Sequence, residues 1–414
     1  MKFKLINFII LLVMMNGVIS ALSKCSGITL PVSPISFIII LSIPYIIYLF
    51  LLAVQKKYVK DYINILFFVV FFIMTFKLMF FAMDLSFSSI TFTYLYYVFP
   101  LFYFYIGTSL SKVEIDKTIK NIFYAGLVLL SISFVQYLFF ESLPSCLTDL
   151  PFLSSVDQDK YMREYLDIVF YRPNGLVSNP ITFGYFLLIL LAITLYYFNK
   201  YNKMKYLLIV LAISFMIFSL LSRTNILNMI MLFSLFAYYR FGLSITIISS
   251  MLTILILLIA IPILYEMNPL VTFVIDRFTE KDTYAAASTQ EHLDDFKAAI
   301  DSITNNFLFG IPEGVYVGED QIITDGAWLS LVLHFGIFAF VAYILIWMLL
   351  AFSSYLLSKE GEYKGLFFSI FFITIIENFF NSAMLDKGMH VFIWILFGLA
   401  YRLSQISLKG KYHE

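Results

Sequence analysis

Residues 38–54 read IIILSIPYIIYLFLLAV, a continuous apolar run of the kind that a transmembrane helix requires. A helix rises about 1.5 Å per residue, so roughly 20 mostly apolar residues cross a hydrocarbon layer about 30 Å thick. Similar runs recur along nearly the whole chain of 414 residues, of which 61% are hydrophobic and 13% are charged. No soluble core could hide so much apolar surface, so we expect an all-α polytopic membrane protein. A β-barrel would need short alternating segments instead.

The apolar runs predict about twelve transmembrane helices. Their ranges are 5–23, 35–54, 63–83, 90–111, 119–140, 181–198, 206–221, 225–239, 243–264, 326–350, 365–383 and 389–403. The first is interpreted as an uncleaved helix rather than a signal peptide. Two long segments, 141–180 and 265–325, divide the chain into N-terminal (1–140), central (181–264) and C-terminal (326–414) helices.

Lysine and arginine residues indicate which segments face the cytoplasm. With the N-terminus inside, seventeen of them fall on inner segments, whereas the short outer loops carry only Lys24, Arg223 and Lys387. This positive-inside bias predicts an inner-membrane protein with both termini in the cytoplasm. Acidic residues gather in the two long segments, so we expect 141–180 and 265–325 to form the extracytoplasmic working surface.

Other classes of function leave few traces in the sequence. No basic tract with interleaved aromatic residues is present, which disfavours nucleic-acid binding. The two cysteines, Cys25 and Cys146, are too few for a disulfide framework, and no CxxC or His/Cys cluster indicates a metal site. We expect both cysteines to face outward as unpaired thiols, with a bridge between them as the less favoured alternative.

The first long segment ends with RPNG at 172–175 and SNP at 178–180, directly before an apolar run. The serine or Asn179 can cap the next helix and the proline suits its first turn, so Arg172 is brought near a positive helix end. A guanidinium binds phosphate oxygens bidentately and helix N-termini add amide donors, which predicts a phosphate site. The alternative is an interfacial arginine that contacts lipid headgroups. Arg163, deeper in the segment, is a further candidate.

Arg223 lies in LSRT at 221–224, a tight outward turn between two predicted helices. This loop is too short to leave the membrane interface, so the arginine runs against the positive-inside bias and needs an anionic partner. We expect that partner to be a substrate, with an ion pair to a loop carboxylate as the alternative.

The second long segment predicts an amphipathic helix. Its sequence STQE at 288–291 is a capping box that should open the helix. Acidic residues then fall largely on one face, as in a helix that lies on the membrane or against the bundle. His292 and Lys297 are candidate site residues, although a solvated helix face is the commoner explanation for both. The apolar face comprises Leu293, Phe296, Ile300 and Ile303.

Asp325 and Gly326 stand at the start of a late apolar run. A carboxylate there is favoured by the helix dipole and is ionised, so it can accept a proton from a hydroxyl or simply cap the helix. We expect His334 to pack or hydrogen-bond within the bundle. Lys77 and Glu377 lie inside predicted spans, where charges are costly, so we expect them to pair or to line a water-filled cleft.

Together these features resemble the O-antigen polymerase and ligase superfamily. Its members share a large outer loop in the second half of the chain, an R-x-x-G…N-P segment, an S-R turn, and a glycine followed by (H or D)-(N, S or G)-x9-G-x-x-small. The resemblance covers roughly 170–340 and depends on the order and spacing of the motifs. The matching residues are Arg172, Gly175, Asn179, Pro180, Ser222, Arg223, Gly310, Asp325, Gly326, Gly336 and Ala339.

Two departures bear on the activity that the resemblance implies. Ligases typically carry histidine where this chain has Asp325, whereas polymerases often carry aspartate, which favours a polymerase. The family also often has an arginine shortly before the amphipathic helix, where this chain reads STQEH at 288–292. Arg277 is the residue that could take its place.

The resemblance implies a Wzy-type polymerase of O-antigen or capsular repeat units. Such an enzyme moves a growing glycan from undecaprenyl pyrophosphate to a hydroxyl of a new lipid-linked unit. Arginines can stabilise the departing pyrophosphate without a metal, cofactor or nucleotide sugar. The expected partners are this lipid-linked glycan, membrane lipids and a protein that regulates chain length. The implied residues are Asp325, Arg172 and Arg223 for catalysis, and Arg277, Arg163, His292 and Asn179 for substrate binding.

Two rival functions remain compatible with the sequence. A ligase of the same superfamily would transfer finished polymer, and a transporter such as a lipid-linked oligosaccharide flippase would also be helical and polar inside. Transporters usually show broken spans at corresponding places in two halves, and the sequence shows no such symmetry. A purely structural protein would leave the outer arginines unexplained.

Overall fold

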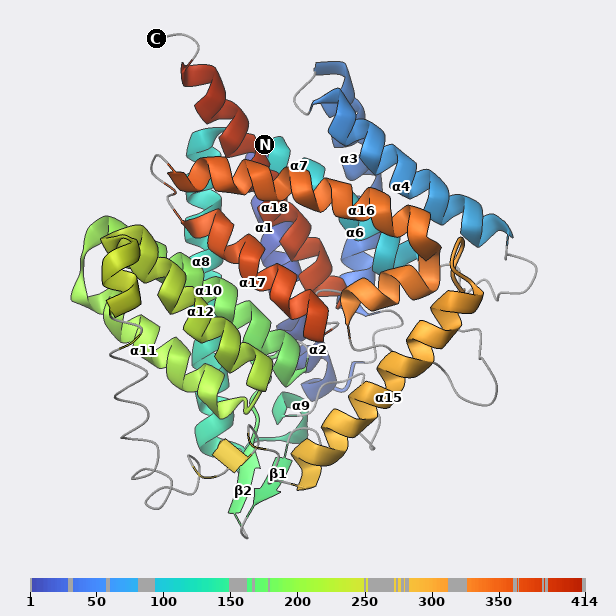
Figure 1. Cartoon of the computed structure of the whole chain (residues 1–414). Helices are drawn as coiled ribbons and strands as arrows, with labels where there is room; N and C mark the ends of the chain where they lie inside the picture. The colour runs from blue at the N-terminus through green and yellow to red at the C-terminus, as the bar shows by residue number, and fades with distance from the viewer. Residues whose placement is uncertain are drawn as a thin grey trace.

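In the computed structural model, the described residues form a helical bundle and a small β-hairpin (Figure 1). The residues that it describes are 2–28, 33–56, 60–80, 94–148, 162–165, 168–177, 179–248, 251, 272, 275–276, 279, 283–311, 326–359, 363, 365–381, 383 and 386–411. The helices are α1 (Lys2–Met14), α2 (Asn16–Cys25), α3 (Pro34–Lys56), α4 (Asp61–Phe80), the π-helix η1 (Tyr94–Val98), α6 (Phe99–Phe102), α7 (Phe104–Thr108), α8 (Lys112–Phe139), α9 (Ser145–Thr148), α10 (Pro180–Tyr201), α11 (Met204–Ser219), α12 (Arg223–Phe241), α15 (Thr283–Asn305), α16 (Ala327–Lys359), α17 (Leu366–Phe380) and α18 (Lys387–Lys411).

Five of the described helices are long and apolar enough to cross a membrane, and a sixth span results if the bent pair α1 and α2 is counted as one. The five lie within α3, α8, α10, α16 and α18. Shorter apolar helices cover Tyr62–Lys77, Met204–Ser219 and Leu366–Phe380, where three further spans are predicted. The predicted span 243–264 falls largely outside the described residues. The chain is therefore a helical membrane protein, and twelve spans remain a prediction.

Several predicted spans are broken rather than straight. The first bends by 60° between α1 and α2. The fourth is divided into η1, α6 and α7, with a turn at Tyr103. The span in α16 contains a kink at Gly336, whose φ of 73° is not helical. Breaks in membrane helices expose backbone groups that neighbouring segments must satisfy, so these positions mark close packing.

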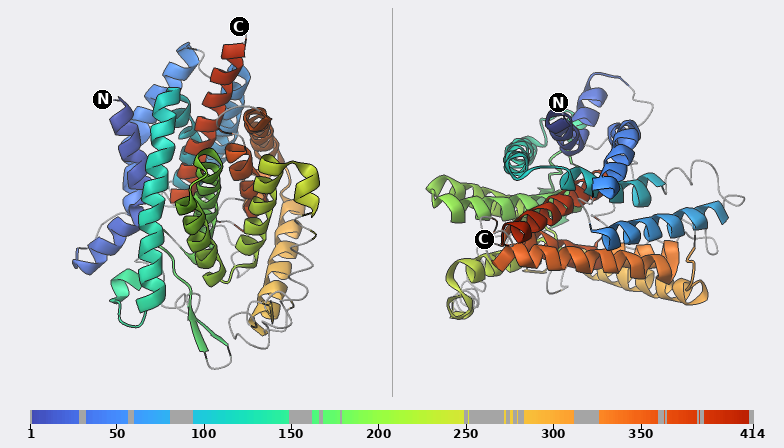
Figure 2. Two further views of the ribbon diagram at one scale, coloured as in Figure 1. Left: turned by 90° about the vertical axis from the view of Figure 1, so that its left-hand side faces the viewer. Right: turned by 90° about the horizontal axis from the view of Figure 1, so that it is seen from above.

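Helices α10 and α18 are the most buried of the five long apolar helices. The most apolar windows of these helices are 89% and 83% buried, whereas that of α3 is 33% buried and thus faces outward. Helix α18 contacts α1, α7, α16 and α17, and it runs through the middle of the molecule when seen from above (Figure 2).

The segment 141–180 contains a β-hairpin that the sequence analysis did not predict. Strands β1 (Met162–Tyr165) and β2 (Ile168–Tyr171) pair antiparallel, with Arg163 opposite Phe170. The aromatic and β-branched residues of IVFY suit a strand, but runs this short are not distinguishable from loop by periodicity.

Helix α15 begins at Thr283, so the expectation that STQE at 288–291 opens the helix is wrong. The preceding residues 285–287 are alanines, which have the highest helix propensity and extend the helix towards its N-terminus. The helix is amphipathic as predicted, and among its described side chains the buried ones lie in the C-terminal part. Ile303 is buried against α16, whereas Leu293 and Phe296 are exposed.

Cys25 and Cys146 form a disulfide, so the expectation of unpaired thiols is wrong. Their Cα atoms lie 5.3 Å apart although 121 residues separate them in sequence. The bridge joins the end of α2 to α9. This region and the hairpin lie at one end of the bundle, and both chain termini lie at the other (Figures 1 and 2).

We expect both cysteines to react with a membrane-impermeant maleimide only after reduction. In spheroplasts treated with an impermeant reductant, each chain should gain two labels, because a stable disulfide requires the oxidising, extracytoplasmic side. The mass of the purified protein measures this directly. A Cys25→Ser/Cys146→Ser variant controls for background. Labelling without reduction, or only after membrane rupture, would contradict the expectation.

Candidate functional site

Arg172 follows β2 and is buried, with 6% of the residue exposed. Its Nε donates a hydrogen bond to the carbonyl oxygen of Leu220, at a donor–acceptor distance of 2.6 Å. Leu220 directly follows α11 and stands just before the Ser222-Arg223 turn. The fold therefore brings together the RPNG and S-R motifs, which are about fifty residues apart in sequence. Burial also argues against the alternative of a headgroup anchor, because such an arginine keeps its guanidinium at the membrane surface.

Gln136 on α8 holds the loop that follows Arg172, and sequence reasoning missed it. Its Oε1 accepts a hydrogen bond from the amide of Gly175 at 2.9 Å, and its Nε2 donates to Oδ1 of Asn174 at 3.0 Å and to the carbonyl of Leu147 at 2.7 Å. These hydrogen bonds fix the loop, because a buried amide group that lost one of its partners would cost free energy of folding. The sequence offered one signal for this role, which is that Gln136 is a polar residue near the end of the apolar run 119–140.

Asn179 caps α10, as predicted. Its Oδ1 accepts a hydrogen bond from the amide of Thr182 at 2.8 Å, and Pro180 is the first residue of the helix. The residue is exposed, so the capping role accounts for the side-chain oxygen.

Arg223 is the first residue of α12 and is partly exposed. The predicted tight turn lies at 220–222, where Leu221 has a left-handed φ of 53°. Ser222 caps the helix, and its hydroxyl accepts a hydrogen bond from the amide of Asn225 at 3.4 Å. Arg223 therefore lies at the positive end of the helix dipole, which favours a bound anion and disfavours the cationic side chain itself.

Glu377 on α17 is completely buried beside this region. Its two carboxyl oxygens accept hydrogen bonds from Nδ2 of Asn228 at 2.9 Å and of Asn381 at 2.8 Å. The partners of Glu377 are therefore amides and not Lys77, so the expected pairing is wrong, whereas the alternative of a water-filled cleft stays a prediction. Lys77 is also buried, and its ammonium group lies 5.5 Å from the ring centre of Phe335. Amide donors satisfy the carboxyl group and link α12 to α17.

Gly310 and Gly336, two of the motif glycines, contact each other. The amide of Ile311 donates to the carbonyl of Leu333 at 2.6 Å, and the amide of Ile337 donates to the carbonyl of Phe307 at 3.0 Å. A Cβ on Gly310 would lie 2.4 Å from the Leu333 carbonyl oxygen. The segment after α15 therefore packs backbone to backbone on the α16 kink and satisfies its freed groups.

His334 is held in the same place, as expected for a residue that hydrogen-bonds within the bundle. Its Nδ1 lies 3.2 Å from the carbonyl oxygen of Ile311, and Ser330, one turn earlier, lies 3.2 Å from the hydroxyl of Tyr97. The contact at Nδ1 agrees with the expected hydrogen bond within the bundle.

The start of α16 lies against the end of α17. The amide of Ala327 donates a hydrogen bond to the carbonyl oxygen of Asn381 at 3.3 Å. Asn378, next to Glu377 on α17, is also buried. Gly326 is thus placed close to the polar end of α17. Asp325, which precedes it in the chain, lies outside the described residues, as does Arg277.

Two more predicted site residues are placed by their backbone alone. Arg163 is in β1 and His292 is in α15, while their side chains are outside the description. Lys297 forms an exposed pair with Asp294 at 3.4 Å, which agrees with a solvated helix face. Hydrogen bonds from Gln290 and Lys297 lower the pKa of the Asp294 carboxyl group.

Neither known protein families nor characterised proteins match this chain in sequence comparisons. The superfamily resemblance therefore depends on the short motifs and on how the fold arranges them.

Proposed function

We propose that the protein polymerises undecaprenyl-pyrophosphate-linked oligosaccharide repeat units on the extracytoplasmic face of the inner membrane. A hydroxyl of the incoming lipid-linked unit would attack the anomeric carbon of the growing glycan. A glycosidic bond forms, the bond from that carbon to the pyrophosphate oxygen breaks, and the electron pair leaves with the lipid pyrophosphate. The product is a chain longer by one unit.

The observation that supports this proposal most is the buried hydrogen bond between Arg172 Nε and the Leu220 carbonyl. This bond holds Arg172 beside the turn that precedes Arg223. The two arginines therefore lie in the same region of the bundle. Guanidinium groups held in place before the reaction stabilise charge that develops on a departing pyrophosphate, because little reorganisation is needed.

In this proposal, Arg172 and Arg223 bind the leaving pyrophosphate, and Arg277 contributes a third cation. Asp325 accepts the proton of the attacking hydroxyl, which suits a carboxylate at a helix start. Arg163, His292 and Asn179 contact the glycan or its phosphates. The buried Glu377 group positions the end of α17 against Gly326, next to Asp325 in the chain.

The proposed topology has both termini in the cytoplasm. The disulfide supports it, because Cys25 and Cys146 lie at the end opposite the termini, and disulfides persist in oxidising compartments. The exposed apolar residues Leu293 and Phe296 of α15 suit contact with lipids at the outer surface. A chain-length regulator is the proposed protein partner.

A strain that lacks the gene tests the function through its surface glycan. We expect long chains to disappear from a gel of the glycan while a single repeat unit remains attached to its final acceptor. A ligase would instead leave polymer on the carrier lipid and none on the acceptor. A flippase would leave repeat units on the cytoplasmic side, out of reach of an impermeant glycan label. Unchanged glycan would refute all three functions.

A further inference from the structure

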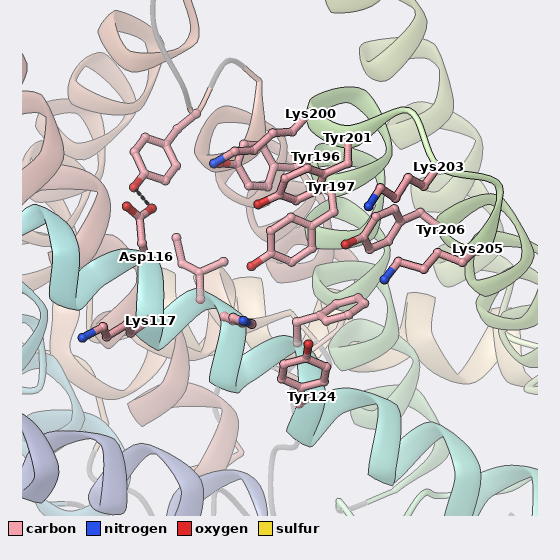
Figure 3. A pocket seen from close by; sticks show the side chains of 14 residues that line it. Asp116, Lys117, Tyr124, Tyr196, Tyr197, Lys200, Tyr201, Lys203, Lys205 and Tyr206 are labelled. Carbon is pink, nitrogen blue, oxygen red and sulfur yellow. Dashed lines mark hydrogen bonds between the residues drawn. The ribbon is translucent and has the colours of Figure 1, made fainter.

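A cavity of about 460 Å³ lies between α8, α10 and α11. It lies at the start of α8 and at the end of α10, towards the end of the bundle that carries the chain termini and away from the hairpin (Figure 1). One wall is the first third of α8, and the other is the end of α10 with the turn into α11 (Figure 3). The cavity is separate from the residues assigned to polymerisation.

The cavity is strongly basic. Five lysines and one carboxylate line it, and that carboxylate, Asp116, accepts a hydrogen bond from the hydroxyl of Tyr363 at the rim. Lysines at this end are expected from the positive-inside bias, but that bias does not require them to converge on one space. The lining lysines are Lys117, Lys120, Lys200, Lys203 and Lys205.

Tyrosine rings hold several of these lysines beside the cavity. The ammonium group of Lys205 lies 5.1 Å from the ring centre of Tyr206, and that of Lys200 lies 5.7 Å from the ring centre of Tyr196. The rings of Tyr197 and Tyr206 also pack together, with centres 5.7 Å apart. Cation–π contacts limit the freedom of the lysine side chains, while their ammonium groups keep donors for a ligand.

Exposed apolar residues follow the cavity-lining residues along both α8 and α11. On α8, Val128 stands one turn beyond Tyr124 and is exposed; on α11, Leu208 and Leu211 are exposed beyond Lys205. Helices α8 and α11 contact each other, and we refer to these three exposed residues as the α8–α11 strip. A phospholipid, with an anionic headgroup and apolar acyl chains, suits a basic cavity next to exposed apolar residues.

We propose that the cavity binds the phosphate group of an anionic phospholipid in the cytoplasmic leaflet, with an acyl chain along the α8–α11 strip. Basic pockets between transmembrane helices on the cytoplasmic side suit such headgroups. A soluble phosphate could satisfy the same lysines, but it would leave the apolar strip unused. This site requires the membrane location and the proposed topology, and it is independent of the polymerase function.

Native mass spectrometry of the full chain in detergent tests the proposal. Phosphatidylglycerol and phosphatidylcholine are added in equal amounts, and bound lipid is counted for the wild type and for Lys120→Glu/Lys205→Glu. We expect the wild type to prefer phosphatidylglycerol, and the variant to bind it at least about tenfold more weakly. A matched control, Lys4→Glu/Lys60→Glu, reverses two exposed lysines outside the cavity and should keep the preference.

A conservative variant, Lys120→Arg/Lys205→Arg, should also keep the preference, so a folding defect of the glutamate variant does not decide the outcome. Equal binding of both lipids by the wild type would overturn the lipid assignment. In that case, stabilisation of the wild type by inorganic phosphate, absent in the glutamate variant, would identify a soluble ligand instead. If neither lipid nor phosphate distinguishes the wild type from the glutamate variant, the cavity is not a phosphate site.

Discussion

Replacement of Arg172 with alanine should leave single-repeat glycan and almost no long chains. Removal of one preorganised donor to developing negative charge costs about 10²–10³ in rate, so polymerisation should fall by at least about 100-fold. A gel of the surface glycan from a complemented deletion strain measures the effect. Arg172→Lys should restore little activity, because lysine lacks the planar fork that binds phosphate bidentately.

The control for this experiment is Arg240→Ala, which removes a guanidinium from the other end of α12 and should leave the ladder normal. The amount of protein in the membrane must be compared as well, because Arg172 also contacts the Leu220 carbonyl. Long chains produced by a normally abundant Arg172→Ala protein would remove this residue from the mechanism.

Replacement of Gly310 with alanine should destabilise the fold more than an ordinary surface change. The residue has a φ of 66°, and an added Cβ would lie 2.4 Å from the Leu333 carbonyl oxygen and 2.7 Å from the Gly336 nitrogen. The left-handed conformation costs about 1–2 kcal/mol for a residue with a side chain, and overpacking costs about 1–3 kcal/mol more. The temperature of thermal unfolding in detergent should therefore fall clearly.

Gly242 provides the matched control for Gly310. It also has a positive φ, of 84°, but nothing lies within 4 Å of an added Cβ. Gly242→Ala should therefore show the backbone cost alone and a smaller fall in unfolding temperature. Equal effects of the two substitutions would mean that the contact between Gly310 and Gly336 contributes no stability.

Hydropathy predicted where the helices lie better than how they run. The apolar runs located α3, α8, α10, α16 and α18, because each buries a long apolar surface against lipid or protein. The same signal does not report bends: 5–23 and 90–111 were each predicted as one span, although Asn16-Gly17 directly follows the break at Met15 and Pro100 shortly precedes the one at Tyr103. The start of α15 was predicted too late, because the capping box at 288–291 indicated a helix start, whereas the high helix propensity of the preceding alanines extends the helix.

The site was predictable as a set of motifs but not as a set of contacts. The cap at Asn179 follows from local sequence, and it is present. The bond from Arg172 to Leu220, the Cys25–Cys146 bridge and the amide partners of Glu377 join residues far apart in the chain. Nothing local specifies such pairs, so they become visible only when the packing of the helices is known.

The position of the two cysteines has a consequence for biogenesis. On the proposed topology both are exported, but 121 residues separate them, and synthesis at about 5–20 residues per second makes Cys146 later by about 6–24 s. During that interval Cys25 is a thiol without its native partner, open to capture by another oxidised species. A nascent chain arrested before Cys146 would therefore carry a lone reactive sulfur, which distinguishes an unfinished molecule from a finished one.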